Sequence, residues 1–412
     1  PLFLSLFTAL TTLFVGPHLK FNFISIIIFS GSIAFSDYLR AKLFTGFPWN
    51  LWAYSTTWAN EILQILNLTG LYLYNLLVIT FFTIPVIIFF RISTSRKLLV
   101  FSLCILIVLS LYIYGNYEIN KNRKILNNVN QSIFVKVVSP NFDLQYGLTE
   151  REIEERFKKL IRYSDPDKNQ KTLFIWPEGV FSGYSFDEVS AFKEMIKNNF
   201  SKKHTIIFGS NKLDKKTGKF FNSMIVVNNN FELIQSYEKL KLVPFGEFLP
   251  FEKALNNFGL KKITEGHGSF LKGTKNNILK IDKSNILPLI CYEIIFTDLI
   301  QNSDYDTNLI INISEDGWFG KSIGPDQHFS KSIFRAIENN TFLLRSANQG
   351  VSAIIDNKGN IIKQLNRNEA GNIEFEVPLI KSNKIKNDLI FFMLLITYLL
   401  FFIIRKKTNA KK

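Results

Sequence analysis

Hydrophobic and polar positions divide the chain into two kinds of segment. Almost uncharged apolar runs fill most of the first 115 residues, and another lies near the end: 2–15, 21–35, 71–90, 98–114 and 389–404. A helix needs about 20 apolar residues to cross the hydrocarbon core of a bilayer, and several of these runs approach that length. Because four runs follow one another with few charges inside them, the pattern predicts membrane helices rather than isolated core helices.

Between the fourth and fifth runs, short apolar stretches alternate with amphipathic ones. The short stretches predict strands at 133–138, 172–176, 204–209, 223–228, 286–291, 308–313, 343–348 and 351–356, the last of the set. Amphipathic spacing predicts helices at 150–163, 186–200 and about 326–340. Short buried strands interleaved with such helices indicate a layered α/β domain.

We therefore expect four parts. They are a membrane domain with about four transmembrane helices (1–116), a catalytic domain (117–388), a C-terminal transmembrane helix (389–404) and a basic cytoplasmic tail (405–412). The chain begins with Pro rather than Met, so we expect further sequence before it. Basic residues at 91–97 and after 404 mark the cytoplasmic side, which puts the catalytic domain on the outer side. Arg40 and Lys42 fit this alternation less well.

The formal net charge of +15 indicates an anionic partner or a compositional bias. Nucleic-acid binding is not expected, because the lysines are interleaved with Asn, Ile and Phe rather than clustered into a basic stripe. Contact with anionic phospholipid headgroups suits a chain with membrane segments better. A bias toward Lys, Asn, Ile and Phe explains the same excess.

Aromatic residues gather in the loop at 44–58, between two apolar runs, beside Gly46 and Pro48. Aromatic side chains at that level usually anchor a protein at the membrane interface. The functional alternative is that they form a lipid-facing wall of a site.

Cys291 is the first candidate for chemistry. The chain has two cysteines, and Cys104 lies inside an apolar run, so Cys291 has no obvious disulfide partner. It follows a predicted buried strand and precedes Glu293 by two residues. A lone thiol at a strand end is a candidate nucleophile, although free cysteines are also among the most buried residue types.

Glu178 and Lys239 supply the other groups that a thiol nucleophile needs. Glu178 follows a strand and Pro177, and Lys239 precedes a Pro-Phe-Gly loop that carries Glu247. A partly desolvated carboxylate can take the thiol proton, and a nearby lysine favours the thiolate and stabilises an oxyanion. Alternatively, Glu178 is a surface residue and Lys239 belongs to a solvated lysine run.

The four histidines, His18, His204, His267 and His328, are dispersed, so a Cys–His pair is poorly supported. The sequence contains neither a glycine-rich phosphate loop nor a cluster of metal ligands, and we expect no cofactor and no metal.

The order Glu178, Lys239, Cys291, in the contexts Trp-Pro-Glu, Tyr-x-Lys and Cys-Tyr-Glu, resembles the nitrilase (carbon–nitrogen hydrolase) superfamily. Longer strings resemble one of its families, the apolipoprotein N-acyltransferases: TGFPW at 45–49, LVPFGEF at 242–248, DGWFG at 316–320, GPDQHF at 324–329, and LRSAN at 344–348 with Gly350.

This resemblance implies a nitrilase-like αββα sandwich inserted between transmembrane helices, on the outer face of the bacterial inner membrane. The family carries more membrane helices than the five runs found here. It moves an acyl chain from a phospholipid, typically phosphatidylethanolamine, onto the α-amino group of a diacylglyceryl-cysteine in an apolipoprotein.

The resemblance also implies roles for individual residues. Cys291 is the nucleophile, Glu178 the general base and Lys239 the oxyanion stabiliser. The supporting residues are Glu247, which orients Lys239; Glu293, which supports the Cys291 loop; Tyr292; and Trp318, near an acyl pocket. The chain departs from the family pattern at Glu315, where Asn is usual, and at 179–181.

Two other functions fit parts of the pattern. One is a membrane-anchored amidase of the nitrilase type that hydrolyses a small amide. The other is a scaffold without activity. The retention of Glu178, Lys239 and Cys291 argues against it.

Overall fold

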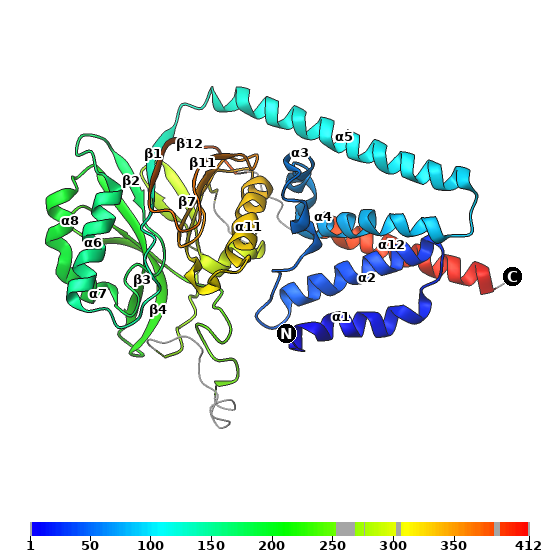
Figure 1. Cartoon of the computed structure of the whole chain (residues 1–412), viewed down its shortest axis with the longest axis horizontal. Helices are drawn as coiled ribbons and strands as arrows, with labels where there is room; N and C mark the ends of the chain where they lie inside the picture. Colours follow the sequence, from blue (N-terminus) through cyan, green and yellow to red (C-terminus); the bar gives the residue numbers. More distant parts are fainter. Residues whose placement is uncertain (1, 253–267, 276, 302–305, 383–387, 411–412) are drawn as a thin grey trace. The chain divides into compact units, whose positions relative to one another are not determined.

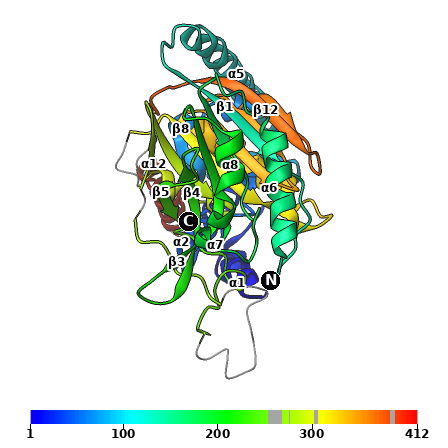
Figure 2. The same ribbon diagram turned by 90° about the vertical axis from the view of Figure 1, so that its left-hand side faces the viewer.

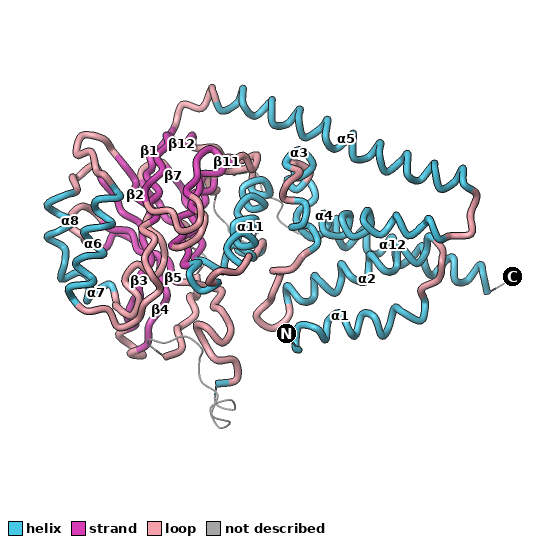
Figure 3. Tube along the Cα trace, in the orientation of Figure 1, coloured by secondary structure: helices cyan, strands magenta, loops and turns pink. Residues whose placement is uncertain are grey.

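The computed structural model describes residues 2–252, 268–275, 277–301, 306–382 and 388–410. His267, residues 383–387 at the expected domain boundary and the last two lysines lie outside this set. The chain divides into two compact units, Pro1–Lys124 with Lys384–Lys412, and Ile125–Asn383. The first is helical, and the second contains the strands (Figure 3).

Apolar helices form the first unit. Its longer helices are α1 (Leu2–Val15), α2 (Phe23–Lys42), α4 (Leu66–Thr83), α5 (Thr94–Leu126) and α12 (Leu389–Ala410). Shorter turns join them: η1 (Gly16–His18), η2 (Trp52–Thr56), α3 (Asn60–Leu63) and η3 (Ile84–Phe89). Among the described residues, three helices are long and apolar enough to span a membrane, Phe23–Lys42, Leu66–Phe89 and Thr94–Leu126; Leu2–His18 and Leu389–Ile404 are shorter.

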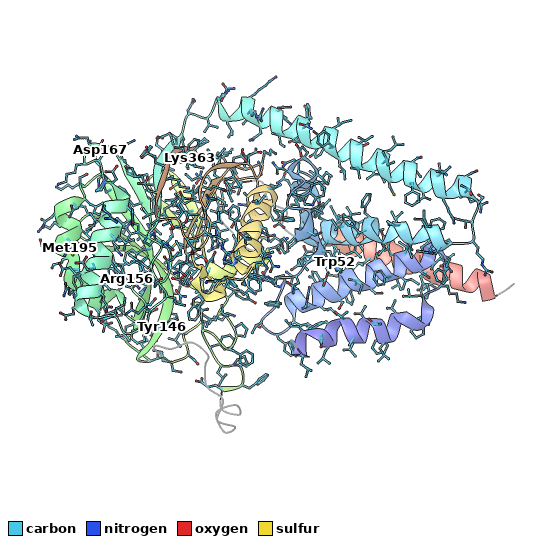
Figure 4. The ribbon with its side chains drawn as sticks, in the orientation of Figure 1. Trp52, Tyr146, Arg156, Asp167, Met195 and Lys363 are labelled. Atoms are coloured by element: carbon cyan, nitrogen blue, oxygen red, sulfur yellow. The ribbon has the colours of Figure 1, made fainter. Side chains whose placement is uncertain are left out.

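Helix α2 continues beyond the apolar run at 21–35, because its charged residues have partners. Asp37 forms an ion pair with Arg40 at 2.8 Å and accepts a hydrogen bond from Asn75 Nδ2 at 3.0 Å. Asn75 also accepts a hydrogen bond from the Ala53 backbone N–H, which ties the aromatic loop to α4. In that loop Trp52 is 57% exposed (Figure 4), which fits either interpretation of its aromatic residues.

The second unit is an αββα sandwich (Figures 1 and 2). One six-stranded sheet has the order β12-β1-β2-β3-β4-β5, and the other has the order β11-β10-β9-β8-β7-β6. Helices α6 (Glu150–Ser164), α7 (Phe186–Val189) and α8 (Lys193–Asn199) pack on the first sheet, and α11 (Gly324–Asn339) packs on the second.

The strand bounds are as follows. The first sheet contains β1 (Ser132–Ser139), β2 (Thr172–Ile175), β3 (His204–Asp214), β4 (Lys219–Val227), β5 (Leu233–Glu238) and β12 (Gly371–Pro378). The second contains β6 (Leu279–Ile281), β7 (Ser284–Ile290), β8 (Leu309–Glu315), β9 (Leu343–Asn348), β10 (Ser352–Ile355) and β11 (Ile361–Leu365).

Alternation along the strands builds two hydrophobic layers. On β2, Leu173 and Ile175 face the second sheet, where Ile290 and Ile311 meet them. Phe174 lies in the other cluster, beneath the helices. Successive side chains of a strand point to opposite faces, so a strand covered on both faces is apolar throughout.

Several expected elements differ from the structure. The expected helix at 186–200 is broken by a 3₁₀ turn, η4 (Ser190–Phe192), between α7 and α8. The stretch at 351–356 is not the last strand, because β11 and β12 follow, and β12 pairs along the whole of β1. Strands β5 and β6 were also not expected. Residues Leu233, Ile234, Ile361 and Ile362 are exposed, so β5 and β11 lack a continuous buried apolar stretch.

Candidate active site

Three strand ends bring the expected catalytic residues together. Strand β2 leads through Trp176 and Pro177 to Glu178, strand β5 leads to Lys239, and strand β7 leads to Cys291. Sites in α/β proteins commonly lie at such strand ends. Glu178 and Lys239 come from the first sheet and Cys291 from the second, so the site lies between the two layers.

A buried ammonium group between two carboxylates dominates the electrostatics of the site. Lys239 Nζ lies 2.8 Å from Glu247 Oε1 and 3.5 Å from Glu178 Oε1, and Lys239 is only 1% exposed. Burial lowers the pKa of Lys239, but the two carboxylates outweigh it and hold the pKa above its usual value. Lys239 is therefore a cation at neutral pH.

Asn222 on β4 is a site residue that the sequence did not reveal. Its Nδ2 donates to Glu178 Oε1 and to Glu247 Oε1, both at 2.7 Å. Its carbonyl accepts from the Lys239 backbone N–H at 2.9 Å. Asn222 thus holds both carboxylates and the lysine backbone, but it lies inside an ordinary strand sequence with no motif around it.

Glu178 is fixed from its other side as well. Its Oε2 accepts a hydrogen bond from the Glu315 backbone N–H at 3.1 Å. Gly209 on β3 leaves room for it, since a Cβ at that position would lie 2.7 Å from Glu178 Cα.

Cys291 has the left-handed backbone that favours glycine. Its φ is +48°, and it is the first residue of the 3₁₀ turn η5 (Cys291–Ile295). For a non-glycine residue this conformation costs on the order of 1–3 kcal/mol, so the surroundings must enforce it. The turn presents the partly buried thiol beyond the end of β7.

Glu293 joins this turn to the end of β5. Its Oε2 accepts from the Ile290 N–H at 2.8 Å, and its Oε1 accepts from Tyr237 Oη at 3.0 Å, Leu240 N at 2.7 Å and Lys241 N at 3.0 Å. Burial raises the pKa of Glu293 to about 7, against the opposing effect of the backbone donors. Through these hydrogen bonds, Glu293 links the nucleophile turn to the segment that carries Lys239.

The thiol rests in its protonated form. Burial and the negative charge of Glu178 raise the pKa of Cys291, while Lys239 acts in the opposite direction. The sequence suggested that the lysine would favour the thiolate, but burial outweighs it. A group that takes the proton during attack is therefore needed, and the carboxylate of Glu178 provides one.

A histidine contacts the backbone of the nucleophile turn, and this contact is not a Cys–His pair, because it is made to the carbonyl oxygen rather than to the thiol. His328 Nε2 is 3.1 Å from the backbone oxygen of Cys291. His328 belongs to the GPDQHF string, which was noted in the sequence without a chemical role. The separation of 37 residues hid the contact.

Tyr292 and Trp318 differ in exposure. Tyr292 is 7% exposed, and burial raises its pKa. Trp318 is 46% exposed, and its ring lies 5.9 Å from that of Tyr146, which is labelled in Figure 4.

The two departures from the family pattern, at Glu315 and at residues 179–181, lie next to each other in the structure. Glu315 is buried, accepts from Gly317 N at 2.9 Å and Asn348 Nδ2 at 2.8 Å, and has a pKa raised to about 8 by burial. A Cβ on Gly179 would lie 2.8 Å from Glu315 Oε2, and Gly179 has a φ of +74°. Glycine at 179 thus makes room for the longer side chain at 315.

Among the described residues, no group of three or more His, Cys, Asp or Glu side chains is arranged to hold a metal ion.

Comparison with known proteins agrees with this architecture. A family model described as carbon-nitrogen hydrolase matches residues 144–386, and one described as apolipoprotein N-acyltransferase N-terminal domain matches residues 1–84. Apolipoprotein N-acyltransferase of Rickettsia typhi is 32% identical over 348 residues, covering 83% of this chain and 68% of that protein. The protein of the same name from Rhodopseudomonas palustris is 29% identical over 393 residues, covering 92% and 72%. Among solved structures, Saccharomyces cerevisiae Nit3 gives a TM-score of 0.45 at 18% identity, covering 61% of this chain and 91% of that one.

The αββα fold and the family match over most of the second unit define a carbon–nitrogen hydrolase. Within that superfamily, the chain belongs to the apolipoprotein N-acyltransferases. It is therefore an acyltransferase of the carbon–nitrogen hydrolase superfamily, and a membrane-anchored amidase is less well supported.

Proposed function

We propose that the chain moves an acyl chain from a phospholipid, through a thioester on Cys291, to the α-amino group of the N-terminal diacylglyceryl-cysteine of an apolipoprotein. The observation that carries this proposal is the buried set of Glu178, Lys239 and Glu247, of which Glu178 and Lys239 lie near enough to the left-handed Cys291 to shift the pKa of its thiol. Nucleophile, base and fixed cation are the groups that acyl transfer through a thioester requires.

In the first half-reaction, Glu178 takes the thiol proton as the Cys291 sulfur attacks the ester carbonyl of the phospholipid. A C–S bond forms, and the negative charge that develops on the carbonyl oxygen is stabilised by the Lys239 ammonium group. Collapse breaks the C–O bond to the glycerol, and the leaving oxygen takes the proton from Glu178. A lysophospholipid departs and the acyl chain stays on the sulfur.

In the second half-reaction, the α-amino group of the acceptor attacks the thioester. Glu178 takes a proton from the amine, Lys239 again stabilises the oxyanion, and the C–S bond breaks as the amide forms. The thiol regains its proton from Glu178. The ester bond of the donor supplies the driving force, so the reaction needs no nucleotide.

Glu247, Asn222 and Glu293 serve this chemistry by fixing the lysine and the nucleophile turn. Tyr292 follows the nucleophile directly. We assign Trp318 to the acyl chain, because its large apolar side chain is half-exposed on the loop that follows β8.

The donor proposed is phosphatidylethanolamine, and the site of action is the outer face of the bacterial inner membrane. Basic residues between the spans, Arg91, Arg96 and Lys97, favour a cytoplasmic position for that loop. Helix α5 would then leave the cytoplasm and carry the second unit on the outer side. Protease added to sealed spheroplasts should cleave the second unit and spare the 91–97 loop.

The experiment that tests the function follows triacylation of a diacylglyceryl lipopeptide by mass spectrometry. The wild-type protein should add one acyl chain, Cys291→Ala should add none, and Cys104→Ala should match the wild type. Full activity of Cys291→Ala would remove the thioester from the mechanism. Hydrolysis of a small amide by wild-type protein that leaves the lipopeptide unchanged would favour an amidase.

A further inference from the structure

A buried polar network lies behind the Cys291 turn. Asp316 begins the 3₁₀ turn η6 (Asp316–Phe319), His328 lies on α11 and Arg345 lies on β9. Each of the three is at most 1% exposed. Arg345 Nη2 lies 2.7 Å from Asp316 Oδ2, and His328 Nδ1 lies 2.9 Å from Asp316 Oδ1. The proposed chemistry gives none of these three residues a role.

The contact with Cys291 fixes one proton on the imidazole. His328 Nε2 lies 3.1 Å from the Cys291 carbonyl oxygen, and because a carbonyl only accepts, Nε2 carries the hydrogen. In the neutral ring Nδ1 then accepts from Arg345 Nη2, 3.1 Å away. In the imidazolium form Nδ1 donates to Asp316. Nε2 donates to the Cys291 carbonyl in both forms.

Burial and the two neighbouring charges act on the protonation of the ring in opposite directions. Burial and the charge of Arg345 hold the pKa of His328 below its usual range, while Asp316 acts in the opposite direction. Burial alone would raise the pKa of Asp316, but the charge of Arg345 lowers it, so Asp316 is ionised.

Hydrogen bonds and close packing from neighbouring residues hold Asp316 in place. Ser314 Oγ donates to Asp316 Oδ1 at 2.7 Å, and Arg345 Nη1 donates to Asn312. A Cβ on Gly350 would lie 2.1 Å from Asp316 Oδ2, so only glycine fits there. Buried charged pairs of this kind add little net stability, and the observed contacts of this one fix the position of the His328 ring.

We propose that His328 is a positioning residue, which is held by Asp316 and Arg345 and donates to the Cys291 carbonyl, thereby setting the peptide plane of the nucleophile. In a trans peptide the N–H of the next residue points opposite the carbonyl. Fixing the Cys291 carbonyl therefore also fixes the direction of the Tyr292 N–H and the base of the Cys291 side chain. The contact stabilises the left-handed conformation from the side of α11, as Glu293 does from the side of β5.

The assignment rests on the proposed function, because it concerns acylation of Cys291. In this assignment His328 is not the general base, because the hydrogen on its Nε2 is donated to the backbone carbonyl of Cys291. Three substitutions separate these roles. His328→Gln keeps an N–H donor near the position of Nε2, His328→Asn keeps only a group near the position of Nδ1, and His328→Phe keeps only a ring.

The measurement is the single-turnover rate at which labelled phospholipid acylates Cys291 in the full chain. His328→Gln should acylate within about tenfold of the wild type, with the same pH profile, because glutamine restores the donor and cannot titrate. His328→Asn and His328→Phe should acylate about 10²-fold more slowly, the usual loss when a reacting group is misplaced by about 1 Å.

A second readout separates misplacement from unfolding. Alkylation of Cys291 by N-ethylmaleimide is followed on its own peptide, with the Cys104 peptide as internal reference. Folded variants should alkylate Cys291 within about threefold of the wild type, since Glu178, Lys239 and Ser314 still surround the thiol. Much faster alkylation of Cys291 would identify an unfolded variant. The acylation rate of the His328→Gln variant would then be the result that tests the assignment.

Two results would overturn the assignment: wild-type acylation by a folded His328→Phe, or a 10²-fold loss in a His328→Gln variant that alkylates normally. Failure of the wild-type protein itself to form an acyl-enzyme would instead refute the proposed function.

Discussion

At the scale of single residues, charge placement decides what the site can do. Lys239 is a buried cation because Glu178 and Glu247 both face it, and it therefore stands ready for an oxyanion without having to be protonated first. Burial and the same carboxylate of Glu178 raise the pKa of the neighbouring thiol. One residue thus stabilises the lysine, restrains the thiol and, in the proposed mechanism, takes its proton.

Glu178→Gln and Lys239→Ala should each slow acylation of Cys291. Removing a general base typically costs 10²–10⁴-fold, and removing an oxyanion donor costs about 10²–10³-fold. Time-resolved labelling with a phospholipid donor measures both rates. Glu194→Gln and Lys197→Ala, from an exposed ion pair on α8, are the matched controls and should acylate normally. A thioester that forms at the normal rate in either site variant would show that the residue acts later or not at all.

Glu315 gives the protein a pH-dependent stability. Its pKa is about 8 in the folded protein against an ordinary value of 4.5. Its contribution to stability is fully present below pH 4.5 and is lost progressively as the pH rises to 8, because over that range the carboxyl ionises in the unfolded chain while the folded protein must hold its proton. At 1.36 kcal/mol per pKa unit, the unfolding free energy should fall by roughly 2–3 kcal/mol between pH 6 and 9.

Glu315→Asn should lose this part of the pH dependence. Asparagine does not titrate, and its oxygen can accept from the N–H two residues later in the same way. The midpoint of thermal unfolding in detergent should fall less from pH 6 to pH 9 than that of the wild type. Equal falls in the two proteins would show that Glu315 is already ionised at pH 6.

At the scale of elements, the nucleophile turn is held from two directions. Glu293 links it to the end of β5, and His328 links it to α11. Strands β7 and β5 belong to different sheets, so the geometry of the site depends on the packing of one sheet against the other. The large shared core between the sheets provides that rigidity.

Glu293→Gln should therefore disturb both stability and acylation. The carboxylate accepts from donors at both oxygens, so an amide NH₂ would face an N–H or O–H donor in either orientation. Hydrogen bonds to charged groups are worth about 1.5–3 kcal/mol, and a loss of that size should lower the midpoint of thermal unfolding. Glu376→Gln, exposed on β12, serves as control. An unchanged midpoint would mean that Glu293 does not hold the turn.

Sequence patterns predicted the parts of this site that are local in the chain. Glu178, Lys239 and Cys291 each follow a strand within a short string, and the structure brings all three together. Asn222 and His328 could not be found in this way, because their roles arise from pairing between distant elements. Strands β11 and β12 were missed for a related reason, since half-exposed strands at sheet edges have no long apolar stretch.

At the scale of the whole molecule, the chain combines apolar helices with a hydrolase-type sandwich. A lipid donor explains the helices, since one helix would be enough to anchor an enzyme with a small soluble substrate. One thiol must serve both donor and acceptor, so the lysophospholipid has to leave before the acceptor is acylated. The proposed reaction is therefore ping-pong, and its first half should proceed without any acceptor.

The central claim is tested most directly by incubating the purified protein with phosphatidylethanolamine labelled in its acyl chain and with no acceptor. Lysophospholipid and protein-bound label should appear in equal amounts, and peptide mapping should place the label on Cys291. Neutral hydroxylamine should release the label, as expected of a thioester. Lysophospholipid released without retained label, or label on a residue other than Cys291, would contradict the account.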